Sequence, residues 1–216
     1  MAEAYVKQNS AAAVYIAEIP ADSQIGVLSH EARRREIDQT SNPQAKREKY
    51  FLWRLLEIAI FEEYGLGIPD MKLEKNENGK WISGECSLSF SHSNGAVAVA
   101  LAPSDISVGV DIEALDNTGG KESLAERFFT AEELKEYRNT PEACRTEKFL
   151  SVWTEKEAIF KMKNLPAFAP SRVSTLDFDG FSESKILTVG ERKYILSVAF
   201  SASAKFEIKE VKLQKM

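Results

Sequence analysis

The stretch FLSVWTEKEAIFKM, residues 149–162, combines the apolar spacing of a core-packed helix with charged residues on neighbouring turns. Helix positions i, i+4 and i+8 lie close together, so Trp153, Glu157 and Lys161 share one face. A carboxylate and an ammonium one turn apart, beside an indole, form either an ordinary surface pair or part of a charged site. The stretch alone favours neither interpretation.

A second charged stretch, VGVDIE at residues 108–113, follows an apolar alternating run. In a strand, Asp111 and Glu113 leave the same face, and two carboxylates this close raise each other's pKa unless a cation lies between them. With Glu157 on a facing helix they would supply three oxygen ligands, too few for calcium but suitable for magnesium that keeps water and a substrate phosphate. The alternative is a solvated strand end, which D-x-E alone favours.

The composition is that of a globular protein. The 216 residues are 44% hydrophobic and 28% charged, enough for one large domain or two small lobes. No apolar run is long enough to span a bilayer, and the N-terminus lacks the charged-then-apolar order of a signal peptide. We therefore expect a cytoplasmic protein that does not bind membranes.

Charge and cysteine content exclude further classes. The formal net charge of −5 argues against a general nucleic-acid binder. Cys86 and Cys144 are the two cysteines, with no CxxC pair, so the sequence indicates neither a disulfide framework nor a zinc site. Both are expected to be free thiols.

Local signals predict alternating strands and helices in each half of the chain. Asn42-Pro43 and Thr140-Pro141 each provide a helix start, and Asn78-Gly79 is a strong hairpin signal. Thr130 with Glu133 forms a capping box. Strands are expected at residues 11–19, 88–91, 96–101 and 108–113 and in the tail 173–213, and long helices at 43–64 and 141–163. Ser29 is predicted to cap a shorter helix, a second short helix runs up to Tyr137, and a glycine-containing loop is expected at Gly119-Gly120.

The element order is repeated. Each half runs through a strand, a short helix, a long helix opened by proline and then antiparallel strands. This predicts an α+β fold with an N-terminal lobe at residues 1–104 and a C-terminal lobe at residues 105–216. Each lobe would pack an antiparallel sheet on a long helix, with a cleft between the lobes. Both charged stretches would face that cleft from the second lobe.

Five motifs in a fixed order carry a family resemblance. They are Asn78-Gly79-Lys80, FSHS at 90–93, VGVDIE at 108–113, RFFTAEE at 127–133 and WTEKEAIFK at 153–161. Together they resemble the 4'-phosphopantetheinyl transferases of the monomeric, surfactin-synthetase-activating type, over roughly residues 32–176. Trp81 departs from the proline of the family's GKP turn, and Lys49 replaces a frequent arginine.

The resemblance implies a monomeric pseudo-dimer that binds coenzyme A and Mg²⁺ between its lobes. The enzyme would transfer the 4'-phosphopantetheine arm to a serine of an apo carrier protein and release adenosine 3',5'-bisphosphate. By motif, Asp111, Glu113 and Glu157 are the implied metal ligands. Lys161 is the implied pyrophosphate contact, and the base is either Glu157 or a water held by the metal.

The remaining implied contacts are with coenzyme A. Ser91 and His92 would hold the 3'-phosphate and pyrophosphate end, and Lys80 takes the place of the GKP lysine. Lys49 and Arg33 would add positive charge, although lysine is a point donor and lacks the fork of arginine. The carrier would belong to a fatty-acid, polyketide or peptide synthetase.

Two other functions stay open: a non-catalytic module that binds coenzyme A or a carrier, and an unrelated magnesium-dependent phosphohydrolase. A serine–histidine nucleophile at Ser91-His92 is disfavoured because adjacent strand residues point to opposite faces. Trp153, Phe128 and Phe129 are interpreted as packing residues.

Overall fold

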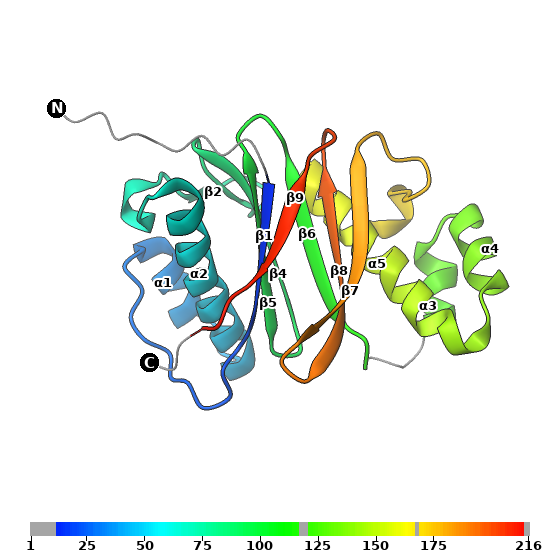
Figure 1. Ribbon diagram of the computed structural model, residues 1–216, viewed down its shortest axis with the longest axis horizontal. Helices are drawn as coiled ribbons and strands as arrows, with labels where there is room; N and C mark the ends of the chain where they lie inside the picture. The colour runs from blue at the N-terminus through cyan, green and yellow to red at the C-terminus, as the bar shows by residue number, and fades with distance from the viewer. Residues whose placement is uncertain (1–11, 117–120, 167–168, 214–216) are drawn as a thin grey trace.

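In the computed structural model of the chain, residues 12–116, 121–166 and 169–213 are described. The elements form four layers, with a short and a long helix on one side, two sheets in the middle and another long helix on the other side (Figure 1). The α+β class with antiparallel sheets is confirmed. Ala11 of the first expected strand and the Gly119-Gly120 loop lie outside the described residues.

The first sheet has the strand order β4 (Cys86–Ser93), β5 (Ala96–Pro103), β1 (Ala12–Glu18) and β9 (Phe206–Glu210). β4, β5 and β1 pair antiparallel, as expected from their alternating sequences. β9 pairs parallel with β1, placing Lys209 opposite Tyr15. The end of the chain therefore completes the sheet that its first described strand belongs to.

Helices α1 (Glu31–Asp38) and α2 (Pro43–Tyr64) cover the outer face of this sheet (Figure 1). α2 starts and ends as predicted: the side chain of Asn42 accepts the Ala45 N–H at 3.0 Å, and Gly65 ends the helix at φ 69°. The predicted cap of α1 was wrong by one residue. His30 caps it instead of Ser29, because its Nδ1 accepts the Arg33 N–H at 3.4 Å.

The second sheet has the order β6 (Val108–Ala114), β8 (Arg192–Phe200) and β7 (Phe181–Val189), all antiparallel. Helix α5 (Arg145–Lys163) packs on its outer face, where Ala158 and Ile159 are buried. Figure 1 shows helices α3 (Lys121–Phe128) and α4 (Ala131–Asn139) beside one end of α5. Short 3-10 turns at Ile68–Asp70, Glu142–Cys144 and Pro170–Arg172 complete the helical elements of the described residues.

The predicted start of the second long helix was wrong. Pro141 is extended at ψ 141°, and a 3-10 turn, Glu142–Cys144, precedes α5, which begins at Arg145. Thr140 caps the C-terminal end of α4 and does not open a helix. The capping box of α4 at Thr130 and Glu133 is confirmed, as is the end of α5 at Lys163.

The predicted hairpin at Asn78-Gly79 is confirmed, with β2 (Glu74–Lys75) paired to β3 (Trp81–Ile82). Gly79 takes φ 77° in its turn, a conformation that glycine adopts without a Cβ clash. Cys86 and Cys144 are both free thiols, also as expected. Across the three described segments, no helix combines the length and apolar character needed to cross a membrane.

The two sheets face each other across a core built from small side chains on one side. β5 contributes Ala96, Ala98, Ala100 and Ala102, all almost fully buried. β6 contributes Val110 and Ile112 to the same core. Because alanines fill little space, they allow β6 of the second sheet to pack close to β5.

A buried ion pair, which the sequence analysis did not anticipate, fixes α5 on its inner side. Lys156 is 0% exposed and its Nζ lies 2.7 Å from the carboxylate of Glu133, which is also buried. Lys156 Nζ also donates to the carbonyl oxygen of Pro170 at 3.0 Å, and Glu133 accepts the Thr175 N–H at 2.8 Å. A charge pair this deeply buried is tolerated because each partner is also hydrogen-bonded.

Gly109 of β6 permits direct contact between strand and helix. A Cβ at this position would lie 1.9 Å from the Ala158 carbonyl oxygen and 2.6 Å from the Met162 nitrogen, both backbone atoms. Gly109→Ala is therefore expected to lower the free energy of unfolding by about 1–3 kcal/mol or more, the usual cost of overpacking. Chemical denaturation measures this.

Gly84→Ala is the matched control, because a Cβ there meets nothing within 4 Å. We expect the control to change the free energy of unfolding by only a few tenths of a kcal/mol, roughly the range of surface substitutions. Equal stability of the two variants would show that the helix is free to move away from the strand.

Candidate functional site

A cavity of about 410 Å³ lies where the first two helices, the hairpin, β4, β6 and α5 meet. One wall carries basic side chains from α1, α2 and β2, and the other carries acidic side chains from β6 and α5. Its polar lining consists of Arg33, Glu36, Lys49, Lys75, Ser91, His92, Asp111, Glu113, Glu157 and Lys161. Both charged stretches of the sequence therefore reach one cavity.

The acidic wall is organised around Asp111, which is 2% exposed. Its Oδ1 accepts hydrogen bonds from Ser91 Oγ and from Lys161 Nζ, both at 2.7 Å. Glu113 Oε2 accepts from Ser93 Oγ, also at 2.7 Å. Lys161 Nζ lies 3.9 Å from Glu157, so a single ammonium sits between two carboxylates.

The carboxylates repel one another through a poorly solvated space. Desolvation, reinforced by the charge of Asp111, raises the pKa of Glu157 to about 8, and the positive charge of Lys161 only partly offsets this. Burial also raises the pKa of Glu113, and Asp111 adds to the shift. The site therefore has a deficit of positive charge, which a bound cation would correct.

The donor set fits a hard divalent cation. Carboxylate oxygens are the preferred ligands of magnesium, and Oδ2 of Asp111 is buried with no hydrogen-bond partner. Among the described residues, no three His, Cys, Asp or Glu side chains lie close enough together to form a ready metal site. The acidic wall thus has the chemistry for such an ion, with Lys161 Nζ lying between two of its carboxylates.

The basic wall gathers three cations around one carboxylate. Glu36 lies 2.9 Å from Arg33, 3.0 Å from Lys75 and 3.4 Å from Lys49. Arg33 is buried against the Trp53 ring, whereas its neighbours Arg34 and Arg35 are exposed. Three positive charges with one compensating carboxylate leave this wall suited to an anionic group.

His92 lies between the two walls, with Nδ1 3.1 Å from Glu48 Oε2. Partial burial lowers the pKa of His92, while the charge of Glu48 acts in the opposite direction. A carboxylate therefore faces Nδ1 of this imidazole.

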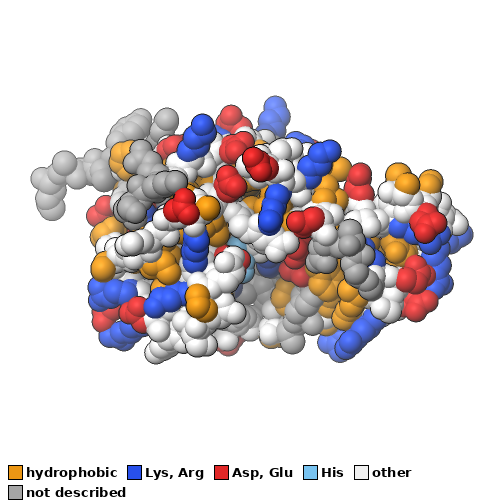
Figure 2. Space-filling view, turned by 90° about the horizontal axis from the view of Figure 1, so that it is seen from below, with side chains coloured by type: hydrophobic (Ala, Val, Ile, Leu, Met, Phe, Trp, Pro, Cys, Tyr) orange, Lys and Arg blue, Asp and Glu red, His pale blue; other side chains and the backbone are white. Residues whose placement is uncertain are grey.

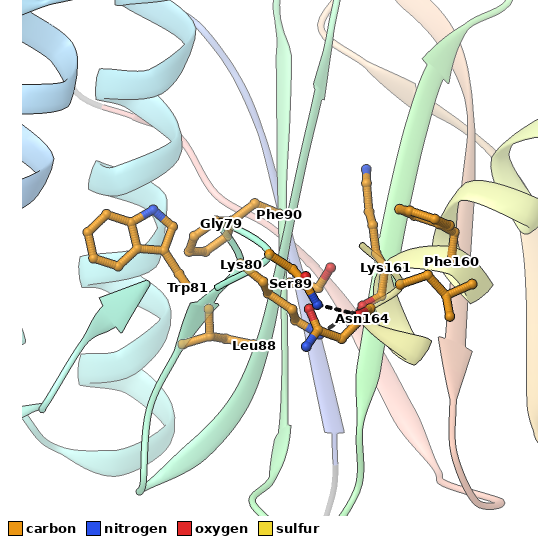
Figure 3. Close-up of a pocket in the computed structure, with 11 residues that line it drawn as sticks. Gly79, Lys80, Trp81, Leu88, Ser89, Phe90, Phe160, Lys161 and Asn164 are labelled. Carbon is orange, nitrogen blue, oxygen red and sulfur yellow. Dashed lines mark hydrogen bonds between the residues drawn. The ribbon is translucent and has the colours of Figure 1, made fainter. Parts of the chain in front are cut away.

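Lys80 lies apart from the charged cavity. Its Nζ donates to the carbonyl oxygens of Lys161 at 2.9 Å and Val108 at 3.3 Å, tying the end of α5 to β6. Burial lowers the pKa of Lys80 to about 8. Figure 3 shows it inside a smaller, mostly apolar cavity of about 230 Å³, where Phe160 lies across from Trp81.

Most residues singled out from the sequence line the charged cavity. Asp111, Glu113 and Glu157 do so with Lys161, as do Ser91, His92, Lys49 and Arg33, whereas Lys80 lines the neighbouring cavity. The sequence analysis missed Lys75, Glu36 and Glu48. Lys75 had a usable signal, since the predicted hairpin puts it opposite Trp81.

The packing interpretation of the aromatic residues agrees with the structure. Phe129 is buried and stacks on Phe149 at 5.3 Å between ring centroids. Trp153 stacks on the other side of Phe149 at 6.0 Å and meets Phe128 edge-on at 5.5 Å. These rings join α3 and the residue after it to α5.

Residues 107–210 match the family model of the 4'-phosphopantetheinyl transferase superfamily. This range includes β6, α5 and the whole acidic wall. The resemblance drawn from the motifs is therefore confirmed.

Two curated proteins are similar to the chain. The 4'-phosphopantetheinyl transferase psf-1 of Bacillus pumilus is 31% identical over 109 residues, 50% of this chain and 46% of that protein. The 4'-phosphopantetheinyl transferase HetI of a Nostoc species is 35% identical over 103 residues, 45% of this chain and 43% of that protein. The chain thus matches less than half the length of each relative.

The raised pKa of Glu157 predicts a pH-dependent loss of stability. Because its pKa is higher in the folded chain, folding takes up a proton, and the free energy of unfolding falls as pH rises from about 4.5 to about 8. Glu157→Gln removes this charge. We expect the variant to be about 1–3 kcal/mol more stable than wild type at pH 8.5, after screening by solvent, and equal to it at pH 4.

Denaturant unfolding without divalent cations measures both values. Glu147→Gln on the exposed side of the same helix is the control, for which we expect no comparable gain at high pH. A Glu157→Gln variant no more stable than wild type at pH 8.5 would contradict the raised pKa.

Proposed function

We propose that the chain transfers the 4'-phosphopantetheine arm of coenzyme A to a serine of an apo carrier protein. The observation that carries this proposal is the single cavity in which Asp111, Glu113, Glu157 and Lys161 face a wall of basic side chains. The acidic half suits a metal and a reacting pyrophosphate, and the basic half suits the remaining phosphate of the nucleotide. The two relatives, both named 4'-phosphopantetheinyl transferases, support the same reaction.

The proposal includes an architecture of two similar lobes, residues 1–104 and 105–216, with the charged cavity as the active-site cleft. β9 of the second lobe crosses over to pair with β1 in the sheet of the first lobe. The positions of α2 and α5 on the outer faces of the two sheets support an approximate two-fold axis between the lobes. We further propose a monomer in the cytoplasm.

Magnesium would be held by Asp111, Glu113 and Glu157. When bound, the ion offsets negative charge on the pyrophosphate oxygens and favours departure of the leaving phosphate. Lys161 contributes a fixed positive charge beside the same oxygens, a role that requires its ammonium to exchange part of its contact with Asp111 for the substrate.

The nucleophile is supplied by the carrier protein, which explains why the chain needs no serine–histidine pair of its own. The proton of the carrier's serine hydroxyl must leave as the new P–O bond forms. Glu157 is the proposed acceptor as well as a ligand, and a water molecule is the alternative.

The basic wall would bind the nucleotide end of coenzyme A. Arg33, Lys49 and His92 are the proposed contacts, and Lys75 joins them from the hairpin. An anionic phosphate here would compete with Glu36 for the same cations. Lys80 retains a proposed role at the cavity edge, although its ammonium is already bonded to two carbonyl oxygens.

The proposed partner is an apo carrier protein of a fatty-acid, polyketide or peptide synthetase. Figure 2 shows one face of the molecule, on which acidic and basic side chains are interspersed. The charge of that face therefore does not indicate one particular carrier. A panel of apo carriers would identify the preferred one.

The direct test incubates the protein with coenzyme A, Mg²⁺ and an apo carrier and weighs the carrier by mass spectrometry. A gain of one phosphopantetheine group is expected with wild type. Asp111→Asn should slow the transfer on the order of 10²-fold or more, because it removes a charge from the proposed metal and pyrophosphate site.

The other outcomes separate the alternatives. Binding of coenzyme A with no change in carrier mass would indicate a non-catalytic module. Release of phosphate without a carrier would indicate a phosphohydrolase. Wild-type rates from Asp111→Asn would contradict the proposed role of the acidic wall.

His92→Ala is expected to act on coenzyme A binding. A hydrogen bond to a charged group contributes about 1.5–3 kcal/mol, so KM for coenzyme A should rise about 10- to 100-fold with little change in kcat. Because Nδ1 faces Glu48, donation from Nε2 requires the doubly protonated imidazole, and a bound phosphate would favour it.

Dephospho-coenzyme A, which lacks the 3'-phosphate, is the discriminating substrate. If His92 contacts that phosphate, His92→Ala should penalise coenzyme A and leave the KM for dephospho-coenzyme A nearly unchanged. An equal rise in KM for both substrates would show that His92 does not contact the 3'-phosphate.

A further inference from the structure

Four alternate serines of β4 connect the two sheets. The hydroxyl of Ser87 accepts the Val108 N–H at 3.2 Å, and that of Ser89 accepts the Val110 N–H at 3.1 Å. Ser91 and Ser93 continue the series by accepting the N–H groups of Ile112 at 3.3 Å and Ala114 at 3.4 Å. Each bond joins residues 21 apart, so β4 and β6 run parallel with side chains in place of a backbone ladder.

We call Ser87, Ser89, Ser91 and Ser93 the serine ladder. Alternate residues of a strand leave the same face, so one strand presents all four hydroxyls to β6. Each hydroxyl accepts one backbone N–H of β6 on the edge of that strand that does not pair with β8. Hydroxyl groups therefore set the register between β4 and β6, next to a core between the sheets that is made of apolar side chains.

The second half of the ladder makes an additional contact. Ser91 donates its hydroxyl proton to Asp111 Oδ1 and Ser93 donates to Glu113 Oε2, both at 2.7 Å. Ser87 and Ser89 accept the same kind of N–H bond, but the residues they face on β6 carry no carboxylate nearby. The ladder thus has two purely connecting members and two that also hold an acidic side chain.

The hydroxyl of Ser91 has no capacity left for a phosphate. A serine hydroxyl offers one donor and two acceptor positions. Its proton goes to Asp111, and its two acceptor positions take Ile112 N–H and Lys161 Nζ, the latter at 3.2 Å. Ser91 is also 7% exposed, so its role differs from the direct coenzyme A contact that the motif resemblance implies.

From this geometry we propose that Ser91 and Ser93 are positioning residues that fix the carboxylates of Asp111 and Glu113 for metal binding. The proposal rests on the proposed function for the identity of the metal, but its evidence is the pair of hydroxyl–carboxylate bonds. A carboxylate held by one oxygen keeps the other available: Oδ2 of Asp111 is buried and unpartnered. Partners of this kind typically change metal affinity or activity by about 10- to 100-fold when removed.

The ladder supplies its own matched controls. Ser91→Ala and Ser89→Ala each remove one buried hydroxyl and one N–H bond to β6, but only Ser91→Ala frees a carboxylate. Ser93→Ala and Ser87→Ala form the same comparison at two half-buried positions. Ser93→Thr keeps the hydroxyl and serves as the rescue variant.

The experiment titrates Mn²⁺ into each protein without coenzyme A, follows free Mn²⁺ by electron paramagnetic resonance, and measures stability by denaturant unfolding. We expect every variant to lose stability, because each loses its bond to β6, and Ser91→Ala and Ser93→Ala to lose at least as much as their controls, because each also loses its bond to a carboxylate. Mn²⁺ affinity should fall about 10-fold or more in Ser91→Ala and Ser93→Ala, stay near wild type in Ser89→Ala and Ser87→Ala, and return in Ser93→Thr.

Equal Mn²⁺ affinity within each pair, or no Mn²⁺ binding by wild type, would overturn the positioning role. The carrier-mass assay on wild type and Ser89→Ala is run in parallel. If both bind Mn²⁺ but neither modifies a carrier, the proposed reaction fails while the positioning of the carboxylates stands. If they modify the carrier and Ser91→Ala does so equally well with unchanged Mn²⁺ affinity, the positioning role fails alone.

Discussion

The close approach of α5 to β6 at Gly109 is the constraint on which the acidic wall depends. The helix backbone at Ala158 and Met162 lies directly on the strand, with no side chain between them. Glu157 and Lys161 each precede one of these contact residues, so both lie beside Asp111, two positions further along the strand. A glycine with no catalytic group of its own therefore determines the spacing between the charges.

The elements predicted correctly are those whose signals are local. Asn42, Pro43 and Gly65 determine the ends of α2 through contacts within a few residues, and the structure follows them. Thr140-Pro141 carries a similar signal, yet the fixed φ of proline also suits an extended residue, and Pro141 takes that conformation. The parallel pairing of β9 with β1 depends on contacts across most of the chain, which no local pattern encodes.

The site shows the same division. Strand alternation was sufficient to place Asp111 and Glu113 on one face, and their bonds to Ser91 and Ser93 bear this out. Predicting the contact between Lys75 and Glu36 would have required the position of the hairpin relative to α1, which sequence spacing does not give. Lys156 lies next to Glu157 in sequence, but its side chain lies on another face of the helix. It is buried and forms an ion pair with Glu133.

The return of β9 to the first sheet has consequences for how the chain folds. Tyr15 and Lys209 are partners 194 residues apart, and Lys209 also bonds Glu63 of α2 at 2.6 Å. During synthesis, this edge of β1 stays unpaired until residues 206–210 have left the ribosome. An open strand edge is prone to pair with strands of other chains, and β9 covers this edge of β1. β1 is therefore an internal strand of the first sheet only once β9 has paired with it.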